Sequence, residues 1–213
     1  MSRTRRYQLQ CPIARALDVL GDRWSLLILR DLHAGPAGFR ELQEGLGVAS
    51  NLLSIRLSEL TEAGLIQKQG TGSRSPYALT DAGRQTDGVL WDLVRFGGQL
   101  EREVDPRAPG NLRTLALPLR IMLESVEDRP EVTVGLIVDG ERFTMVSTQE
   151  EVRVEYGDTV PVDLVVQTDY EAILDVGEGV MGLDDFGAHH LEVVEGDEHA
   201  PAFLGLMAEA LAP

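Results

Sequence analysis

The acidic side chains of this chain are concentrated in its second half. Residues 1–107 contain 14 Lys and Arg and 13 Asp and Glu, a net charge of +1, whereas residues 108–213 contain 5 and 22, a net charge of −17. The change coincides with residues 105–111, whose two prolines and one glycine are typical of a linker. The sequence therefore predicts two domains, residues 1–104 and 112–213, with a linker at 105–111. Only the first is electrostatically suited to lie on DNA.

The overall composition is that of a soluble globular protein, with 43% hydrophobic and 25% charged residues. No apolar run approaches the roughly 20 residues of a membrane-spanning helix. The basic N-terminal segment is not followed by the apolar core of a signal peptide. We therefore expect a cytoplasmic protein with no membrane partner. Cys11 is the single cysteine, which excludes a disulfide within the chain.

Residues 47–65 contain a clear helical pattern. One side carries leucines at intervals of four and three residues, Leu53, Leu57 and Leu60. The other side carries short polar side chains and Ile55, while Ser50 and Gly64 are suited to cap the two ends. Asn and an apolar tip can contact adenine and a thymine methyl. The pattern is therefore compatible with a DNA-recognition helix and also with an ordinary packed amphipathic helix.

The neighbouring patterns predict a helix-turn-helix followed by a β-hairpin, or wing. The expected elements are helices at 12–32, 39–46, 50–63 and 81–104, and strands at 65–69 and 77–80. Gly21 and Asp22 are expected to interrupt the first helix. The last helix carries an apolar line, Val89, Leu93, Phe96, Leu100 and Val104. With helix 12–20 this line predicts a homodimer interface, although packing inside the domain would explain the same pattern.

The second half combines strand patterns with flanking helices, which makes the fold class α+β. Helices are expected at 112–126, 170–176 and 201–211, and strands at 132–138, 142–148, 152–156, 162–168 and 191–194. Turn signals at Asp139-Gly140 and Gly157-Asp158 separate neighbouring strands. We therefore expect an antiparallel sheet with helices packed on it.

A series of short motifs runs through residues 11–100. They are Cys11-Pro12, Gly21-Asp22-Arg23-Trp24 followed by Leu26-Leu27-Ile28-Leu29-Arg30-Asp31-Leu32, Phe39-Arg40-Glu41-Leu42, Leu57-Ser58-Glu59-Leu60, Gly64-Leu65-Ile66, Tyr77, Leu79-Thr80 and Asp81-Ala82-Gly83-Arg84. In content and spacing they resemble the HxlR-type family of bacterial winged helix-turn-helix transcription regulators. The resemblance implies a homodimer that binds double-stranded DNA sequence-specifically and controls transcription, most often as a repressor.

Carried over to this chain, the resemblance makes residues 50–63 the recognition helix. The residues expected at base edges are Asn51, Ser54 and Ile55, and those expected at the DNA backbone are Arg40, Ser50, Arg56, Ser73 and Arg74. For Arg40 and Arg56 the alternative is a surface ion pair with Glu41, Glu59 or Glu62.

Cys11 coincides with a family cysteine that senses oxidants in some members. Its position just before a helix, with Arg15 one turn on, would favour a thiolate. The alternative is a small packing residue at a helix start. A redox-sensing role for Cys11 is therefore a hypothesis.

Residues 112–213 resemble a sterol-carrier-protein-like fold. The matching segments are Val162-Asp163-Leu164-Val165-Val166, Thr168-Asp169-Tyr170, Gly182-Leu183 and His190-Leu191-Glu192-Val193-Val194-Glu195-Gly196-Asp197. The resemblance implies an apolar cavity, and hence a hydrophobic small-molecule effector, although the same side chains could simply fill a core. The pattern identifies no ligand-binding residue.

The histidines and carboxylates of the second half match no metal or catalytic motif. They are His189, His190, His199, Asp184, Asp185 and Asp197. Nucleophile elbows, phosphate-binding loops and paired cysteines are also missing from the sequence. We therefore expect no enzyme activity, metal or cofactor. The alternative to a regulator is a lipid or small-molecule carrier that retains a winged-helix dimerisation domain.

Overall fold

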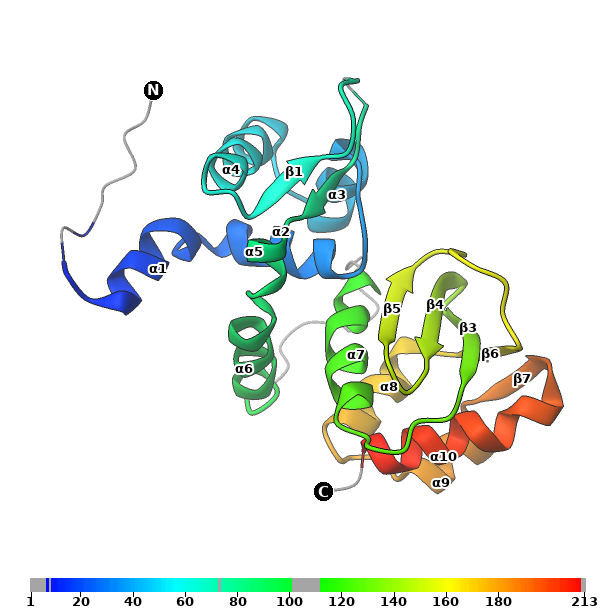
Figure 1. The fold of residues 1–213 in the computed structure, drawn as a ribbon. Helices are drawn as coiled ribbons and strands as arrows, with labels where there is room; N and C mark the ends of the chain where they lie inside the picture. Colours follow the sequence, from blue (N-terminus) through cyan, green and yellow to red (C-terminus); the bar gives the residue numbers. More distant parts are fainter. Residues whose placement is uncertain (1–6, 8, 73, 101–111, 212–213) are drawn as a thin grey trace. The chain divides into compact units, whose positions relative to one another are not determined.

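The computed structural model describes residues 7, 9–72, 74–100 and 112–211 (Figure 1). The chain divides into two compact units, residues 1–90 and 91–213. This boundary lies earlier than the predicted one at residues 105–111, and that predicted linker lies outside the described residues. Each unit is considered by itself below.

Four helices open the first unit. They are α1 (Pro12–Leu20), α2 (Arg23–His33), α3 (Phe39–Leu46) and α4 (Ser50–Glu62). The predicted interruption of the first helix is confirmed, because Asp22 caps α2 by accepting a hydrogen bond of 2.9 Å from the Trp24 N–H. Gly47, with φ of +63°, provides the left-handed residue at the end of α3 and allows the tight turn into α4.

The leucine stripe of α4 forms part of the core of the first unit. Leu53, Leu57 and Leu60 are each no more than 1% exposed. Ser50 was predicted to be the N-cap, but the structure places Ala49 there and Ser50 in the first helical turn. Gly64 follows the helix in a left-handed conformation, with φ of +73°.

The wing is a two-stranded antiparallel hairpin of β1 (Ile66–Lys68) and β2 (Tyr77–Leu79). Ala37 forms an isolated bridge to Tyr77, with N–H···O distances of 2.9 and 2.8 Å. The turn between α2 and α3 is therefore attached to the hairpin. The sequence did not predict this pairing, because a single bridging residue produces no alternating pattern.

The predicted helix at residues 81–104 is wrong in its continuity. The structure contains α5 (Asp81–Arg84) and α6 (Asp87–Gly97), separated by a break at Thr86. The backbone N–H and the hydroxyl of Thr86 both donate to the Gly83 carbonyl oxygen, at 3.1 and 2.7 Å. This local hydrogen bonding ends the first helical turn, which the apolar periodicity could not reveal.

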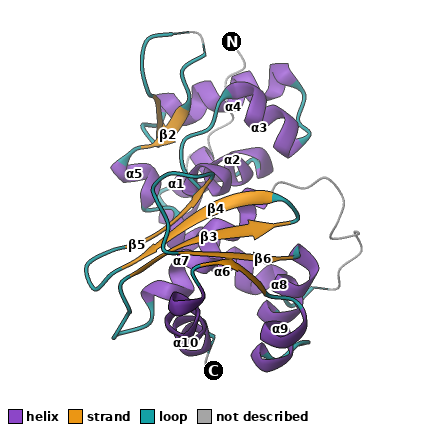
Figure 2. Ribbon diagram, turned by 90° about the vertical axis from the view of Figure 1, so that its right-hand side faces the viewer, coloured by secondary structure: helices purple, strands orange, loops and turns teal. Residues whose placement is uncertain are grey.

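The second unit places its helices on one face of a five-stranded sheet (Figure 2). The remaining elements are the 3₁₀ helices η1 (Leu112–Leu115) and η2 (Asp197–His199), the helices α7 (Ala116–Glu124), α8 (Tyr170–Gly177), α9 (Leu183–His189) and α10 (Ala200–Ala210), and the strands β3 (Val132–Val138), β4 (Glu141–Ser147), β5 (Val152–Tyr156), β6 (Leu164–Thr168) and β7 (Glu192–Glu195). The strand order is β5-β4-β3-β6-β7.

The strand register explains which side chains face the helices. Leu136 pairs with Phe143 on one side and with Val166 on the other, so all three side chains lie on the same face. All three are no more than 5% exposed. This face is the core of the second unit.

Two details of the second unit differ from the prediction. The sheet was expected to be antiparallel, but its central pair, β3 and β6, is parallel. The excursion through β4 and β5 returns the chain to the other side of β3, and strand patterns alone do not determine that return. Helix α9 was not predicted, because Gly187 and two acidic residues obscure an apolar periodicity.

Candidate nucleic-acid interface and cavity

The outer face of α4 presents the three residues predicted to contact bases. Asn51, Ser54 and Ile55 are all exposed, Ile55 by 47%. Their polar groups are held locally: Asn51 Oδ1 accepts from the Leu52 N–H at 2.8 Å, and the Ser54 hydroxyl donates to the Ser50 carbonyl oxygen at 2.9 Å. Asn51 must release this bond before both ends of its amide can address an adenine.

The residues predicted at the DNA backbone are distributed around α4. Ser50 is exposed in the first turn of α4, and Arg74 is exposed in the wing. Arg40 lies in the first turn of α3 and forms an exposed ion pair with Glu44 at 2.9 Å. Its side chain is 89% exposed, so this pair is weak and the guanidinium can exchange partners. Ser73 lies outside the described residues.

Arg56 occupies a different position from the other candidates. Its guanidinium lies 2.8 Å from Asp22 and 2.5 Å from Glu59, and its side chain is only 20% exposed. The sequence offered an ion pair with Glu59 as the alternative to a DNA contact of Arg56, and the structure contains this ion pair. The structure adds Asp22, which the sequence did not suggest because it is distant along the chain.

Lys68 is a wing residue that sequence reasoning did not single out. It is exposed at the end of β1, and its ammonium lies 5.2 Å from the centre of the Tyr77 ring. The sequence did contain a signal for this residue, because a basic side chain in a strand of the wing can contact DNA phosphates. Arg74 and Lys68 together place positive charge on the hairpin.

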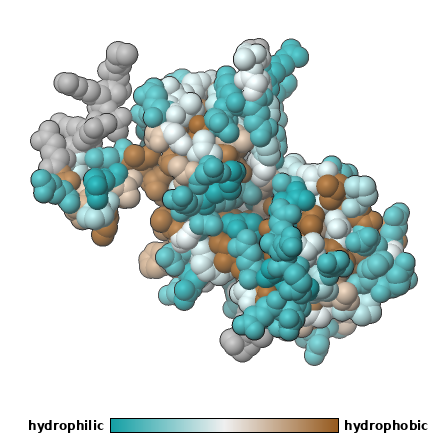
Figure 3. All heavy atoms as spheres, viewed as in Figure 1, coloured by the Kyte–Doolittle hydropathy of each residue, from teal (hydrophilic) through white to brown (hydrophobic). Residues whose placement is uncertain are grey.

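Apolar side chains are exposed on α1 and α6 (Figure 3). On α1, Ile13 is 69% and Leu17 is 45% exposed; on α6, Leu93 is 45% and Phe96 is 61% exposed. Such contiguous apolar residues on a helix face are typical of a protein interface. Val104, the last residue of the predicted apolar line, lies outside the described residues.

Cys11 is exposed at the N-cap position of α1, and its side chain makes no capping hydrogen bond. A thiol in this place is open to reagents in solution, which redox sensing requires. Sensing itself stays a prediction.

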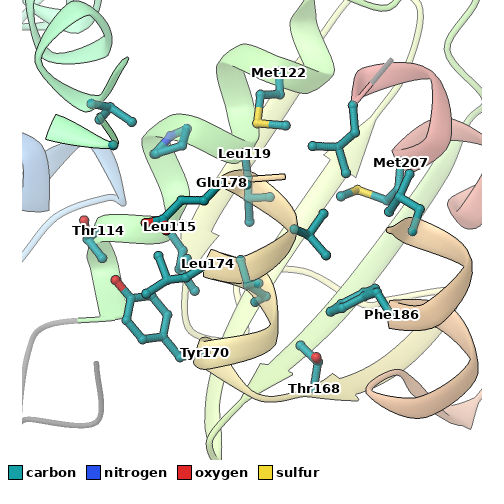
Figure 4. Close-up of a pocket in the computed structure, with 18 of the residues that line it drawn as sticks. Thr114, Leu115, Leu119, Met122, Thr168, Tyr170, Leu174, Glu178, Phe186 and Met207 are labelled. Atoms are coloured by element: carbon teal, nitrogen blue, oxygen red, sulfur yellow. The ribbon is translucent and has the colours of Figure 1, made fainter. Parts of the chain in front are cut away.

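The second unit contains a cavity of about 580 Å³ between the sheet and its helices (Figure 4). This volume lies within the range of small-molecule sites. Leu136 and Met145 line it from the sheet, and Leu119 lines it from α7. Helices α8, α9 and α10 contribute further apolar side chains, including Leu174, Phe186 and Met207. The polar residues are few, and from residues 112–211 they are Thr114, Thr168, Tyr170 and Glu178.

The histidines of the second unit do not come together. His189 Nδ1 lies 3.2 Å from the Asp185 carbonyl oxygen, and His199 is in η2 beside Glu198. His190 Nδ1 lies 3.0 Å from Asp169 Oδ2, next to the cavity residues Thr168 and Tyr170.

Asp169 has a structural role at the start of α8. Its Oδ1 accepts a hydrogen bond of 2.8 Å from the Ala172 N–H and thereby caps the helix. Burial raises the pKa of Asp169, but the interactions with His190 and the Ala172 N–H outweigh it, so the pKa lies below its usual value.

Within the described residues, no helix has both the length and the apolar character needed to cross a membrane. The same residues contain no cluster of three or more His, Cys, Asp or Glu side chains that could hold a metal ion.

Comparison with known proteins connects the N-terminal half of the chain to a family. Residues 19–105 match the family described as HxlR-like helix-turn-helix. An uncharacterized HTH-type transcriptional regulator of Mycobacterium tuberculosis is 38% identical over 90 residues, which are 41% of this chain and 57% of that protein. A second such regulator, from Synechocystis, is 34% identical over 98 residues, which are 44% of this chain and 73% of that protein. The chain thus spans little more than half the length of its mycobacterial relative.

A solved structure is similar to the second unit. It is the solution structure of a conserved Thermus thermophilus protein described as a candidate sterol carrier protein. The two chains are 16% identical, and the match covers 43% of this chain and 71% of the other with a TM-score of 0.32.

Proposed function

Because the chain belongs to the HxlR-like helix-turn-helix family, we propose that it is a dimeric, sequence-specific DNA-binding regulator of transcription. The observation that supports this proposal best is the surface of α4. Its leucines are buried, while Asn51, Ser54 and Ile55 project together from a helix that follows a tight turn. This is the chemistry of a helix that reads base edges in the major groove.

The surroundings of α4 support a defined orientation on DNA. Arg40 on α3 and Arg74 in the wing are exposed and suited to contact phosphates of the DNA backbone. Glu59 and Glu62 lie in the last turn of α4 and would repel phosphate. In the proposed complex the N-terminal half of α4 therefore enters the groove and its C-terminus points away.

The proposed homodimer uses the apolar faces of α1 and α6. Ile13, Leu17 and Phe96 would be costly to leave in water, and each fully buried side chain of this kind contributes roughly 1.5–3 kcal/mol. A twofold dimer also presents two copies of α4 to a DNA site built of paired half-sites.

We further propose that the cavity of the second unit binds a hydrophobic effector that alters DNA affinity. Its volume and apolar lining support a small-molecule site. Such a ligand regulates only if it binds the DNA-competent and incompetent states with different affinity. Repression is the proposed outcome, because the family resemblance most often implies it.

The decisive experiment is electrophoretic mobility shift with the DNA upstream of the protein's own gene. Wild-type protein should retard this DNA in preference to a shuffled duplex of equal length, at several salt concentrations. A double variant, Asn51→Ala with Ile55→Ala, should keep its thermal stability because both side chains are exposed, and should lose that preference.

The same experiment separates the regulator from a small-molecule carrier that merely retains a winged helix. Equal binding to both duplexes, unaffected by the double variant, would contradict sequence-specific recognition. The observation that supports a carrier is the cavity. A carrier would bind its ligand but would show no preference for the upstream duplex.

A further inference from the structure

We propose that the cavity of the second unit selects a neutral apolar molecule with one hydrogen-bonding group, and that Thr168 is the residue that recognises this group. The inference rests on the proposed role of the cavity as an effector site. It names the chemical class of the ligand and a residue that determines specificity.

The first argument is the charge of the lining. Among the cavity residues within 112–211, none is basic, and Glu178 is the charged one. Arg95, in the part of α6 that belongs to the second unit, also lines the cavity, but its side chain is exposed. Residues 108–213 carry a net charge of −17. A carboxylate or phosphate would therefore lose its hydration without gaining a buried cation.

The second argument is the adaptability of the apolar lining. Met122, Met145 and Met207 line the cavity together with Phe186 and Phe203. Thioethers are flexible and polarizable and make favourable contacts with aromatic rings. Figure 4 shows Met122, Met207 and Phe186 around the same space. This composition favours ring-containing ligands without demanding a single shape.

The third argument is an unpaired hydroxyl in this apolar setting. Thr168 is 7% exposed and lines the cavity at the end of β6, and its Oγ1 has no hydrogen-bond partner among the described residues. A buried hydroxyl without a partner is unfavourable, and most buried polar groups in proteins are satisfied. Rotation about the Cα–Cβ bond exchanges the positions of hydroxyl and methyl, so a ligand group at this end of the cavity can become its partner.

The structure also provides a matched control for Thr168. Ser147 is 3% exposed, and its buried hydroxyl likewise finds no partner within the part of the chain that the structure describes. Ser147 lies on the helix-covered face of the sheet, opposite Val132 and Val152, but does not line the cavity. Removing either hydroxyl relieves the same kind of burial cost, so thermal stability should be kept or raised in both variants. Only removal of the Thr168 hydroxyl should change ligand binding.

The test uses three compounds with a shared naphthalene body: 2-methylnaphthalene, 2-naphthalenemethanol and the anion 2-naphthoate. Their Kd values are measured on the full chain by displacement of the neutral fluorophore 1-N-phenylnaphthylamine. Thr168→Val should raise the Kd of the alcohol about fivefold to tenfold, which corresponds to the loss of one neutral hydrogen bond. The Kd of the hydrocarbon should change by less than about twofold. Ser147→Ala should leave the Kd values of both compounds unchanged. Thr168→Ser keeps a hydroxyl at this position and should bind the alcohol with the wild-type Kd. Wild-type protein should bind 2-naphthoate at least tenfold more weakly than the alcohol.

Each contrary result has a distinct meaning. Binding of both neutral compounds with no selective effect of Thr168→Val overturns the role of Thr168, while the cavity remains a ligand site. Binding of 2-naphthoate as tight as the alcohol overturns the selection of neutral molecules. Failure of both neutral compounds to bind overturns the proposed effector site itself, and this inference with it.

Discussion

Arg56 and Asp22 connect the proposed recognition helix to the start of α2 through an ion pair of 2.8 Å. Asp22 also caps α2, because its other carboxylate oxygen accepts a hydrogen bond from the Trp24 N–H. One acidic residue thus fixes the beginning of one helix and holds the middle of another. Arg56 faces the protein, although it is adjacent in sequence to Ile55 on the exposed face.

We expect Arg56→Ala to destabilise the first unit by about 1–2 kcal/mol, since it removes a guanidinium that contacts two partly buried carboxylates. Thermal unfolding measures this. Arg40→Ala is the control, because the pair of Arg40 with Glu44 is highly exposed and should contribute less than about 0.5 kcal/mol. Unchanged stability of Arg56→Ala, together with a reduced salt dependence of DNA binding, would instead make Arg56 a phosphate contact.

Asn51 and Arg74 should affect DNA binding in different ways. Asn51→Ala is expected to reduce discrimination between the preferred site and a site with one changed base pair, by about 1–3 kcal/mol. Arg74→Ala should weaken all duplexes alike and lower the slope of log K against log salt by about 1. Fluorescence anisotropy titrations at several salt concentrations distinguish these outcomes, and identical behaviour of the two variants would contradict their assigned roles.

Phe96→Asp on α6 should dissociate the proposed dimer. The side chain is 61% exposed, so a charge there costs little in the monomer but would be buried without a partner in the dimer. Sedimentation equilibrium should show a higher dissociation constant for this variant. Val180→Asp is the control, because Val180 is 72% exposed outside α1 and α6. A dimer that tolerates Phe96→Asp would exclude this face of α6 from the interface.

Gly83→Ala should strongly destabilise the first unit, by roughly 3 kcal/mol or more. A Cβ at Gly83 would overlap the carbonyl oxygen of Leu65, a backbone atom that cannot easily move. Gly88→Ala in the first turn of α6 is the control, since an added Cβ there meets no described atom within 4 Å, and the change should alter stability by no more than about 0.5 kcal/mol. Urea unfolding measures both variants, and equal effects would show that the contact at Gly83 is readily relaxed.

Asp169 should make the stability of the second unit depend on pH in the acid range. Because its pKa is lower in the folded chain than its usual 3.8, the unfolded chain takes up the proton first as the pH falls. Its contribution is therefore complete above the usual value and is lost as the pH falls through the folded value. Asn caps helices well, so Asp169→Asn isolates the charge.

The measurement for Asp169 is urea unfolding of wild-type protein and Asp169→Asn between pH 7 and pH 2. The wild type should be more stable at pH 7, and the difference should vanish at the acid end. A difference that stays constant over this range would show that the ionisation of Asp169 is not linked to folding.

The sequence alone determined the features that depend on neighbours along the chain. The spacing of Leu53, Leu57 and Leu60 predicted which side of α4 is buried, because helical geometry repeats every 3.6 residues. The same geometry predicted that Asn51 and Ile55 lie opposite the leucines and that Ser54 lies on the flank of the stripe, and the structure exposes all three. The apolar residues of α1 and α6 were likewise identifiable from their helical period. The division of charge between the two halves followed directly from the residue counts.

Only the tertiary structure decided the features that depend on residues far apart in sequence. Asp22, one of the two carboxylates that contact Arg56, lies 34 positions earlier, and no local pattern connects them. The parallel pairing of β3 with β6 depends on how the chain returns after β5. The cavity brings together Leu119, Met145, Thr168 and Met207 from four different elements. Periodicity shows which side chains avoid water, whereas packing in three dimensions decides whether they fill a core or enclose a space, and which hydroxyl remains unpaired inside it.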